Sequence, residues 1–383
     1  MMLRVQSLLV FAFAAMASAK FLGFDPATLG DGKSREFNAY WNIPTFMCHK
    51  YGLNFTEVSS EFGIRQNTGD TFRGNEIAIL YDPGMFPALL KDENGKFIKR
   101  NGGVPQRGNL EEHLKLFEKH LIEQVPDEKF DGVGVIDFES WRPIYRQNWA
   151  SLTPYKDLSV SLVRKEHPSW SNRQVEQEAK EEFEKSGKLF MEKTLKLAQK
   201  LRPLAAWGYY AYPYCYNLTP KQPTTQCNRE TIKENDKMTP WLFMNEDMLF
   251  PSVYMGKKLS QQQRVGLVEG RVREARRIST HMKGTHKILP YFWYRLNDEK
   301  DYYLNGNELE AILREMSTLG ANGVILWGSS DDFKTREKCE NFWGYLMQIF
   351  GPAVKSVVER ARNGYDNQIL YNEEMGNDVN ALR

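Results

Sequence analysis

Short apolar runs alternate with longer stretches of helical periodicity along most of the chain. The apolar runs are rich in β-branched and aromatic residues and are bounded by Gly, Pro, Asn or Asp, which is typical of strands. They predict strands over residues 39–43, 77–81, 132–137, 207–212, 250–255, 287–293 and 323–327. Strand and helix in regular alternation indicate parallel βα units.

The helical stretches carry recognisable ends. Asn109 is suited to cap a helix that Pro126 ends, and Ser171 with Gln174 matches a capping box. The apolar spacing predicts helices over residues 110–124, 171–201, 260–281 and 304–318. His113 and His120 lie seven residues apart on the first of these helices, where we expect a solvated face rather than a metal site.

Four cysteines, which allow three pairings, constrain the fold. Cys215 and Cys227 bracket a Pro-, Asn- and Thr-rich loop, so we expect a local disulfide between them and a second between Cys48 and Cys339. The second would link the end of the first strand to the end of the last. An open doubly wound sheet is one solution for such βα units, but a closed barrel brings these two strands together. We therefore predict an α/β barrel.

The start of the chain resembles a secretory signal. Arg4 precedes an uncharged run over residues 5–19, and Ala17-Ser18-Ala19 matches a cleavage site. We predict a signal peptide over residues 1–19, one domain over 20–362 and a polar tail over 363–383. Secretion fits two disulfides and two glycosylation sequons, at Asn54 and Asn217.

Composition excludes several classes of protein. The chain has 383 residues, of which 41% are hydrophobic and 13% aromatic, so it is neither disordered nor fibrous. Removing Arg4 from the 51 basic residues leaves 50 against 49 acidic ones, a balance that does not indicate a nucleic-acid partner. No segment after residue 19 is apolar enough for a membrane span. We expect no metal and no cofactor.

The candidate chemistry lies where the predicted strands end. Side chains alternate along a strand, so Asp137 and Glu139 point to the same face at the end of a buried, glycine-rich run. Two close carboxylates repel, and the less solvated one retains its proton to higher pH. Such a pair is what cleavage of a glycosidic bond requires. The alternative is that one carboxylate caps the following turn and the other pairs with Arg142.

Aromatic residues occupy other strand ends. Tyr81, Tyr210, Tyr254 and Trp327 end four different predicted strands. Each alone is consistent with a core residue that has a polar tip. Together they offer flat apolar faces and hydroxyl groups to a sugar, so we favour a carbohydrate-binding cleft.

Several longer motifs resemble the animal hyaluronidases, and within them the insect venom members. The likeness covers about residues 38–360 and rests on 137–143 (DFESWRP), 146–149 (RQNW), 208–217 (GYYAYPYCYN), 251–254 (PSVY) and 327–331 (WGSSD). The resemblance implies a distorted, TIM-like (β/α)7 barrel in one domain. It also implies hydrolysis of hyaluronan at β-1,4 bonds, with retention of configuration, by a secreted enzyme found in venoms and known as an allergen.

The resemblance also implies roles for individual residues. Glu139 matches the proton donor, and Asp137 matches the carboxylate that orients the acetamido group of the substrate, whose oxygen is the nucleophile. The expected substrate-binding residues are Tyr81, Arg142, Tyr210, Tyr254, Arg271, Trp327, Ser329, Ser330 and Asp331. The family's disulfides match Cys48–Cys339 and Cys215–Cys227.

Two other functions are consistent with parts of the sequence. One is a carbohydrate-binding protein or allergen on the same fold without turnover, against which the intact Asp137 and Glu139 argue. The other is a chitinase, but its uncharged substrate gives Arg142 and Arg271 no partner, and its acidic signature is incomplete here. The choice between hyaluronan and chondroitin, and the oligomeric state, stay open at this level.

Overall fold

The computed structural model describes residues 36–364 apart from 283 and 285. The predicted signal peptide and nearly all of the predicted tail lie outside these residues. The chain divides into two units, one formed by Phe37–Val358 and the other by Met1–Glu36 with Glu359–Arg383. All predicted site residues belong to the first. None of the described helices is both long and apolar enough to cross a membrane.

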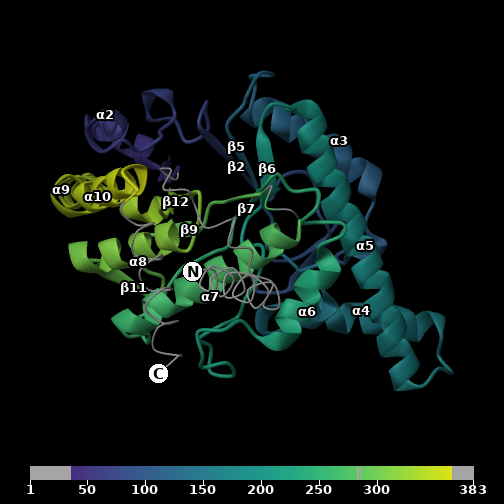
Figure 1. The fold of residues 1–383 in the computed structure, drawn as a ribbon. Helices are drawn as coiled ribbons and strands as arrows, with labels where there is room; N and C mark the ends of the chain where they lie inside the picture. The colour runs from purple at the N-terminus through teal and green to yellow at the C-terminus, as the bar shows by residue number, and fades with distance from the viewer. Residues whose placement is uncertain (1–35, 283, 285, 365–383) are drawn as a thin grey trace, which may run out of the picture. The chain divides into compact units, whose positions relative to one another are not determined.

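Parallel strands occupy the centre of the first unit, with helices around them (Figure 1). They confirm the predicted α/β class. The strands pair in the orders β1 (Asn38–Asn42), β12 (Gly323–Trp327), β9 (Tyr291–Trp293); β2 (Ile77–Tyr81), β5 (Val133–Asp137), β6 (Ala206–Tyr209); and β7 (Met248–Leu249), β8 (Lys287–Ile288). Isolated parallel bridges from Tyr210 to Phe250 and from Ser252 to Tyr291 connect these three sheets.

Between β1 and β2 the connection is indirect. Arg65 pairs with β1, since its N–H donates to Ala39 and its carbonyl accepts from Trp41, both at 2.8 Å. The side chain of Asn67 then bonds the start of β2. Its Nδ2 donates to the Ile77 carbonyl at 2.9 Å, and its Oδ1 accepts from the Glu76 and Ile77 amides at 2.9 and 3.0 Å. A short segment therefore stands where a direct strand ladder would lie.

Three predicted strands differ from the observed ones. The strand predicted over 250–255 is wrong, because β7 ends at Leu249 and the next residues make only isolated bridges. Pro290 has no N–H and separates β8 from β9, which were predicted as one strand. The strand predicted over 207–212 ends at Tyr209, and Ala211 turns to a φ of 72°.

The predicted helices are present, with their caps. Asn109 caps α3 (Leu110–Gln124), and capping boxes open α5 (Asn172–Leu201), α7 (Gln261–His281) and α8 (Gly306–Thr318). Further elements were not predicted. These are α2 (Val58–Phe62), α4 (Thr153–Glu166), α6 (Arg229–Met238), α9 (Arg336–Tyr345), α10 (Gly351–Arg362), the hairpins β3 (Ala88–Lys91) with β4 (Phe97–Arg100) and β10 (Arg295–Leu296) with β11 (Glu299–Tyr303), the π-helix η8 (Leu346–Phe350), and the 3-10 turns η2 (Thr45–Tyr51), η3 (Thr68–Asp70), η4 (Pro105–Arg107), η5 (Tyr145–Gln147), η6 (Ala150–Leu152) and η7 (Ser330–Phe333).

One buried cluster leads directly to the candidate site. It contains inward-facing residues of the parallel strands, among them Ile79, Val135 and Ile325. Two residues further along the same faces come Tyr81, Asp137 and Trp327. Strand alternation therefore carries the apolar interior into the site.

Both predicted disulfides are formed. Cys48 bonds Cys339 with a Cα–Cα distance of 5.8 Å, and Cys215 bonds Cys227 with a Cα–Cα distance of 4.6 Å. The first joins residues 291 positions apart, next to β1 and β12, which pair directly. The pairing of the first strand with the last, inferred from the cysteines, is confirmed.

The solvated face expected for the two histidines of α3 is wrong for His113, which is buried, while His120 is half-buried. His113 is fully buried and accepts a hydrogen bond from the Met85 amide at 2.9 Å, while His120 accepts from the Gly84 amide at 3.0 Å. Burial lowers the pKa of His113 to about 3, so its ring is neutral. Both imidazoles hold the loop that follows β2.

The structure predicts different effects on stability for two glycine-to-alanine changes. A Cβ at Gly134 would lie 2.4 Å from the ring of Trp207, its buried cross-strand partner, so Gly134→Ala should lower the free energy of unfolding by about 1–3 kcal/mol. Gly344, in α9, has no atom within 4 Å of such a Cβ, and its change to Ala should be neutral or slightly stabilising. Chemical unfolding of both variants measures the difference, and equal effects would contradict this packing.

Candidate active site

Two carboxyl groups lie at the carboxyl end of β5. Asp137 is the last residue of the strand and is half-buried, while Glu139 stands on the more open side. The Asp137 carbonyl accepts a hydrogen bond of 2.7 Å from the Asp82 amide, which ties β5 to the loop after β2. Arg100 in turn binds the Asp82 carboxylate through both terminal nitrogens. The main chain beneath the carboxyl pair is therefore tied to the loop after β2.

The pair retains a proton at neutral pH. Burial, then the charge of Glu139 and then that of Asp82 raise the pKa of Asp137 to about 8. Burial also raises the pKa of Glu139, whereas Arg142 opposes that rise. In the free protein, Asp137 is therefore the carboxyl group that carries the proton. This agrees with the repulsion expected from the sequence.

Four aromatic residues meet beside this pair: Tyr81 and Trp327 end β2 and β12, Tyr210 directly follows β6, and Tyr254 lies in the segment after β7. The Trp327 indole N–H donates to the Tyr81 hydroxyl at 2.8 Å. The ring of Tyr254 lies 5.4 Å from that of Trp327 and 6.1 Å from that of Tyr210. Tyr210, Tyr254 and Trp327 also pack on the central apolar cluster. The aromatic group predicted from the sequence is therefore brought together.

A cavity of about 170 Å³ opens next to Glu139. Its walls include Arg142, Tyr210, Ser252 and Arg271, so Glu139 shares this cavity with two guanidinium groups. Glu139 and Arg142 also line a second cavity of about 220 Å³ together with Trp149, a residue that is 51% exposed. The predicted residues Arg142 and Arg271 thus face the same space as the proposed acid.

The two guanidinium groups are held in different ways. Arg142 lies over the ring of Tyr214, 4.9 Å from its centroid. Arg271 donates from Nη1 to the Ser252 carbonyl at 2.5 Å. Burial lowers the pKa of Arg271 to about 10, so it is still charged at neutral pH. Both cations are therefore available to an acidic ligand.

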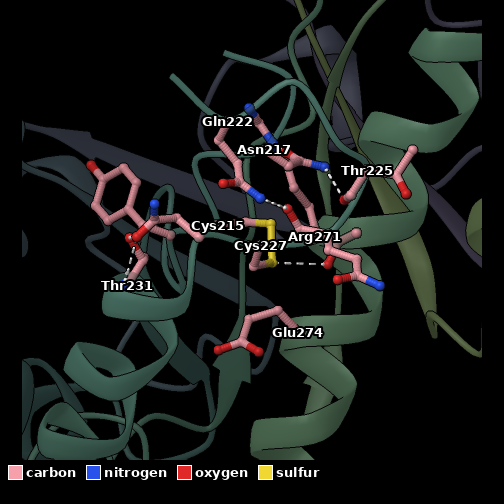
Figure 2. Close-up of a disulfide and its surroundings, with 12 residues drawn as sticks. Cys215, Asn217, Gln222, Thr225, Cys227, Thr231, Arg271 and Glu274 are labelled. Atoms are coloured by element: carbon pink, nitrogen blue, oxygen red, sulfur yellow. Dashed lines mark hydrogen bonds between the residues drawn. A yellow bond between two sulfur atoms is a disulfide. The ribbon is translucent and has the colours of Figure 1, made fainter. Parts of the chain in front are cut away.

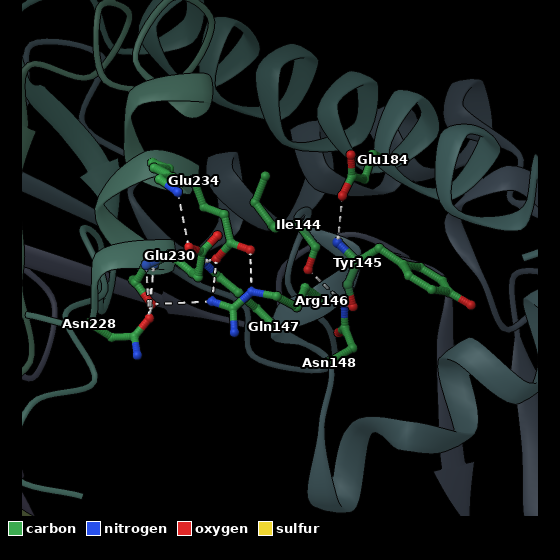
Figure 3. A network of polar contacts seen from close by, with 11 residues as sticks. Ile144, Tyr145, Arg146, Gln147, Asn148, Glu184, Asn228, Glu230 and Glu234 are labelled. Carbon is green, nitrogen blue, oxygen red and sulfur yellow. Dashed lines mark hydrogen bonds and ion pairs between the residues drawn. The ribbon is translucent and has the colours of Figure 1, made fainter. Parts of the chain in front are cut away.

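A network of polar contacts supports the loop that carries Arg142 (Figure 3). Asn148 donates to the Arg142 carbonyl at 2.8 Å and accepts from its amide at 2.9 Å. Arg146 binds both oxygens of the buried Glu234, to which Gln147 also donates at 3.0 Å. Residues 146–149 thus hold the main chain of Arg142 in position.

Three predicted residues, Ser329, Ser330 and Asp331, lie in or next to η7, which follows β12. Ser329 caps η7 by accepting from the Asp331 amide at 3.2 Å. Asp331 is exposed and pairs with Lys334. Ser330 is also exposed. Their participation in a substrate cleft remains a prediction from the resemblance.

The predicted glycan at Asn217 is inconsistent with the structure. Asn217 is 1% exposed, and its Nδ2, the atom that would carry the sugar, donates to the carbonyls of Thr225 at 2.8 Å and Leu267 at 3.1 Å. The sequon pattern could not reveal this burial. Asn54, by contrast, is exposed and remains a predicted glycosylation site. Among the described residues, no three His, Cys, Asp or Glu side chains are grouped to hold a metal ion.

Acid cleavage of a glycosidic bond needs a carboxylic acid that is protonated at working pH and a cleft that holds a sugar. A protonated carboxyl pair, Asp137 and Glu139, among aromatic rings is the arrangement that glycoside hydrolases have, and the class of protein follows from it. The sequence model of the family described as "Hyaluronidase" matches residues 30–368. The chain belongs to the hyaluronidase family.

Named relatives are consistent with this assignment. A hyaluronidase of Apis mellifera is 61% identical over 350 residues, which cover 91% of each chain. The crystal structure of bee venom hyaluronidase in complex with a hyaluronic acid tetramer superposes with a TM-score of 0.83 at 63% identity, covering 84% of this chain and 99% of that one. An "Inactive hyaluronidase B" of Vespula vulgaris is 43% identical over 85% of this chain and 95% of its own length.

The pKa of Asp137 predicts a pH-dependent effect of replacing it. Between pH 3.8, the ordinary pKa of an Asp, and about pH 8, Asp137 holds a proton in the folded protein that it releases in the unfolded chain. The contribution of Asp137 to the free energy of unfolding therefore falls as pH rises through this range. Asp137→Asn is neutral throughout. Its melting temperature relative to wild type should therefore rise between pH 4 and pH 8.

The exposed Glu128→Gln variant is the control for loss of a carboxylate. A difference between Asp137→Asn and wild type that stays constant over this pH range would contradict the raised pKa.

Proposed function

We propose that this protein is a secreted endo-β-N-acetylhexosaminidase that hydrolyses the β-1,4 bonds of hyaluronan with retention of configuration. The observation that carries the proposal is the carboxyl pair of Asp137 and Glu139, which keeps a proton beside a cavity walled by two guanidinium groups. Hyaluronan carries one carboxylate per disaccharide, so it matches that cavity in charge. The bound hyaluronic acid tetramer in the bee venom enzyme supports the same substrate.

In the first step, the carbonyl oxygen of the substrate's acetamido group attacks the anomeric carbon. The bond to the leaving oxygen breaks, and that oxygen takes the proton of Glu139. The product is a cyclic oxazolinium ion. Asp137, as a carboxylate, accepts the acetamido N–H and lies next to the positive charge that develops, which lowers the energy of the transition state.

In the second step, water attacks the anomeric carbon from the side that the leaving group vacated. Glu139 now accepts a proton from the water, and the acetamido group is released. Two inversions at one carbon give net retention. Substrate-assisted cleavage of this kind needs no covalent bond between sugar and protein.

Substrate binding provides a reason for the proton to move from Asp137 to Glu139. A hydrogen bond donated to a carboxylate favours its charged form. The acetamido N–H therefore lowers the pKa of Asp137, and the single proton passes to its neighbour. Glu139 is thus protonated when the scissile bond is in place.

The remaining predicted residues have binding roles in this proposal. Arg142 and Arg271 pair with uronate carboxylates, Tyr210 and Tyr254 bond the acetamido group, and Trp327 packs against its methyl. Tyr81 positions Trp327 through their hydrogen bond. The cleft extends to Ser329, Ser330 and Asp331 at its other end.

The strands that bear these residues form the distorted (β/α)7 barrel expected from the sequence. The bridges between the three sheets support closure on one side, and the segment of Arg65 and Asn67 supports it between β1 and β2. A barrel places all strand ends around one opening, as the site requires.

A binding protein without turnover is the alternative, and one relative is named "Inactive hyaluronidase B". The intact acid pair favours the enzyme. Glu139→Gln keeps the shape of the side chain but removes the transferable proton, so kcat on hyaluronan should fall by about 10²–10⁴-fold. Affinity for hyaluronan oligosaccharides should persist in calorimetric titration.

The assay compares the secreted protein on hyaluronan, chondroitin and chitin, with the products sized. Near-normal turnover by a folded Glu139→Gln variant would overturn its role as the acid. Cleavage of chitin but not hyaluronan would overturn the substrate assignment.

A further inference from the structure

Arg271 is held by a side chain that the sequence marks as a glycosylation site. Figure 2 shows Arg271 beside Asn217, to whose Oδ1 its Nε donates at 3.1 Å. Its Nη1 donates to the Ser252 carbonyl at 2.5 Å. These bonds fix the plane of the guanidinium from two directions. The same guanidinium lines the cavity next to Glu139.

The orientation of Asn217 is itself determined. Its Nδ2 has two hydrogens, and both are used, on the carbonyls of Thr225 and Leu267. A flipped amide would set its NH₂ against the Arg271 N–H and its oxygen against two carbonyls. The Oδ1 of Asn217 therefore has to face Arg271.

The chain around Asn217 is shaped to bring it there. Tyr216 and Leu218 both take positive φ values, 52° and 49°, which side chains with a Cβ disfavour. The adjacent Cys215–Cys227 disulfide closes the loop, and Sγ of Cys227 lies 3.3 Å from the Gly270 carbonyl. An unfavourable backbone persists only where its surroundings hold it.

The facing helix α7 carries glycine where this loop packs. A Cβ at Gly270 would lie 2.0 Å from the Thr225 carbonyl oxygen and 2.6 Å from Nδ2 of Asn217. A Cβ at Gly266, one turn earlier, would lie 2.4 Å from the Thr225 side chain. Arg271 follows Gly270 directly, so this close approach sets the distance between Asn217 and Arg271.

We propose that Asn217 is a positioning residue that aims Arg271 at a carboxylate of the bound polysaccharide. The inference rests on the proposed function, because it assumes an acidic substrate in the cavity. A neutral acceptor suits this role. An Asp at the same place would orient Arg271 equally well but would cancel the charge that the substrate needs.

The test measures both Kd for a hyaluronan octasaccharide and kcat on the polymer. Asn217→Ala should weaken binding about five- to tenfold, because a hydrogen bond to a charged group is lost, and should flatten the salt dependence of Kd. The value of kcat should change less than about twofold, since Asp137 and Glu139 are untouched.

The matched control is Asn228→Ala. Asn228 lies in the same disulfide region and caps α6 by accepting from the Glu230 and Thr231 amides at 3.0 and 3.2 Å. Its loss should lower stability while Kd and its salt dependence stay unchanged. A Kd that shifts equally in both Asn variants would mean that Asn217 is merely structural and would overturn the proposal.

Arg271→Ala completes a double-mutant cycle. In that background Asn217→Ala should have no further effect on Kd, and an undiminished effect would overturn the proposal. An unchanged Kd in Arg271→Ala alone would overturn it too. If the unmodified chain binds the octasaccharide but does not cleave hyaluronan, the proposed function fails while the Kd cycle still decides the role of Asn217.

Two measurements keep the proposal testable if Asn217→Ala does not fold. Arg271→Lys keeps the charge, but its single nitrogen cannot bond Asn217 and Ser252 and still present the same edge to the cavity. It should bind as weakly as Arg271→Ala, and near-normal binding would overturn the proposal. Peptide mapping of the secreted protein should find Asn217 unmodified, because a glycan would replace one of the two Nδ2 hydrogens that hold the amide on Thr225 and Leu267.

Discussion

The chemistry of the site depends on the burial of one carboxyl group, Asp137, beside a second one, Glu139. Asp137 ends β5 and Glu139 follows two residues later, and the apolar interior beneath Asp137 limits the hydration of its carboxyl group. Burial, and then the charge of Glu139, raises the pKa of Asp137 to about 8, so this carboxyl group keeps its proton at neutral pH. A stored proton at the mouth of a cavity is the chemical basis of the proposed cleavage.

The surrounding architecture holds this pair and offers it a substrate. The loop after β2 is fixed by His113, His120 and Arg100, and it bonds the Asp137 main chain through the Asp82 amide. On the other side, Asn148 and Asn217 hold Arg142 and Arg271 through neutral amides. The rigid polar contacts around the site thus leave two cations and one acid facing the same space.

Sequence periodicity was sufficient for the parts of the site that lie on strands. Asp137, Tyr81 and Trp327 end regular apolar runs, so their position and shared face could be predicted, as could the Cys48–Cys339 link. Contacts made by loops could not. Asn217 matches a glycosylation signal, yet its burial depends on a fold of the 215–227 loop against Gly270 that no local pattern encodes. His113 was misassigned because the loop that buries it is distant in sequence.

The central claim is that the substrate's own acetamido oxygen, rather than Asp137, attacks the anomeric carbon. Partially de-N-acetylated hyaluronan tests it most directly, because that polymer keeps its uronate carboxylates for binding but lacks the nucleophile at the modified sugars. The account predicts that every new reducing end is an N-acetylglucosamine and that bonds after free glucosamine stay intact. Cleavage after free glucosamine at a comparable rate would contradict it and would indicate a carboxylate of the protein as the nucleophile.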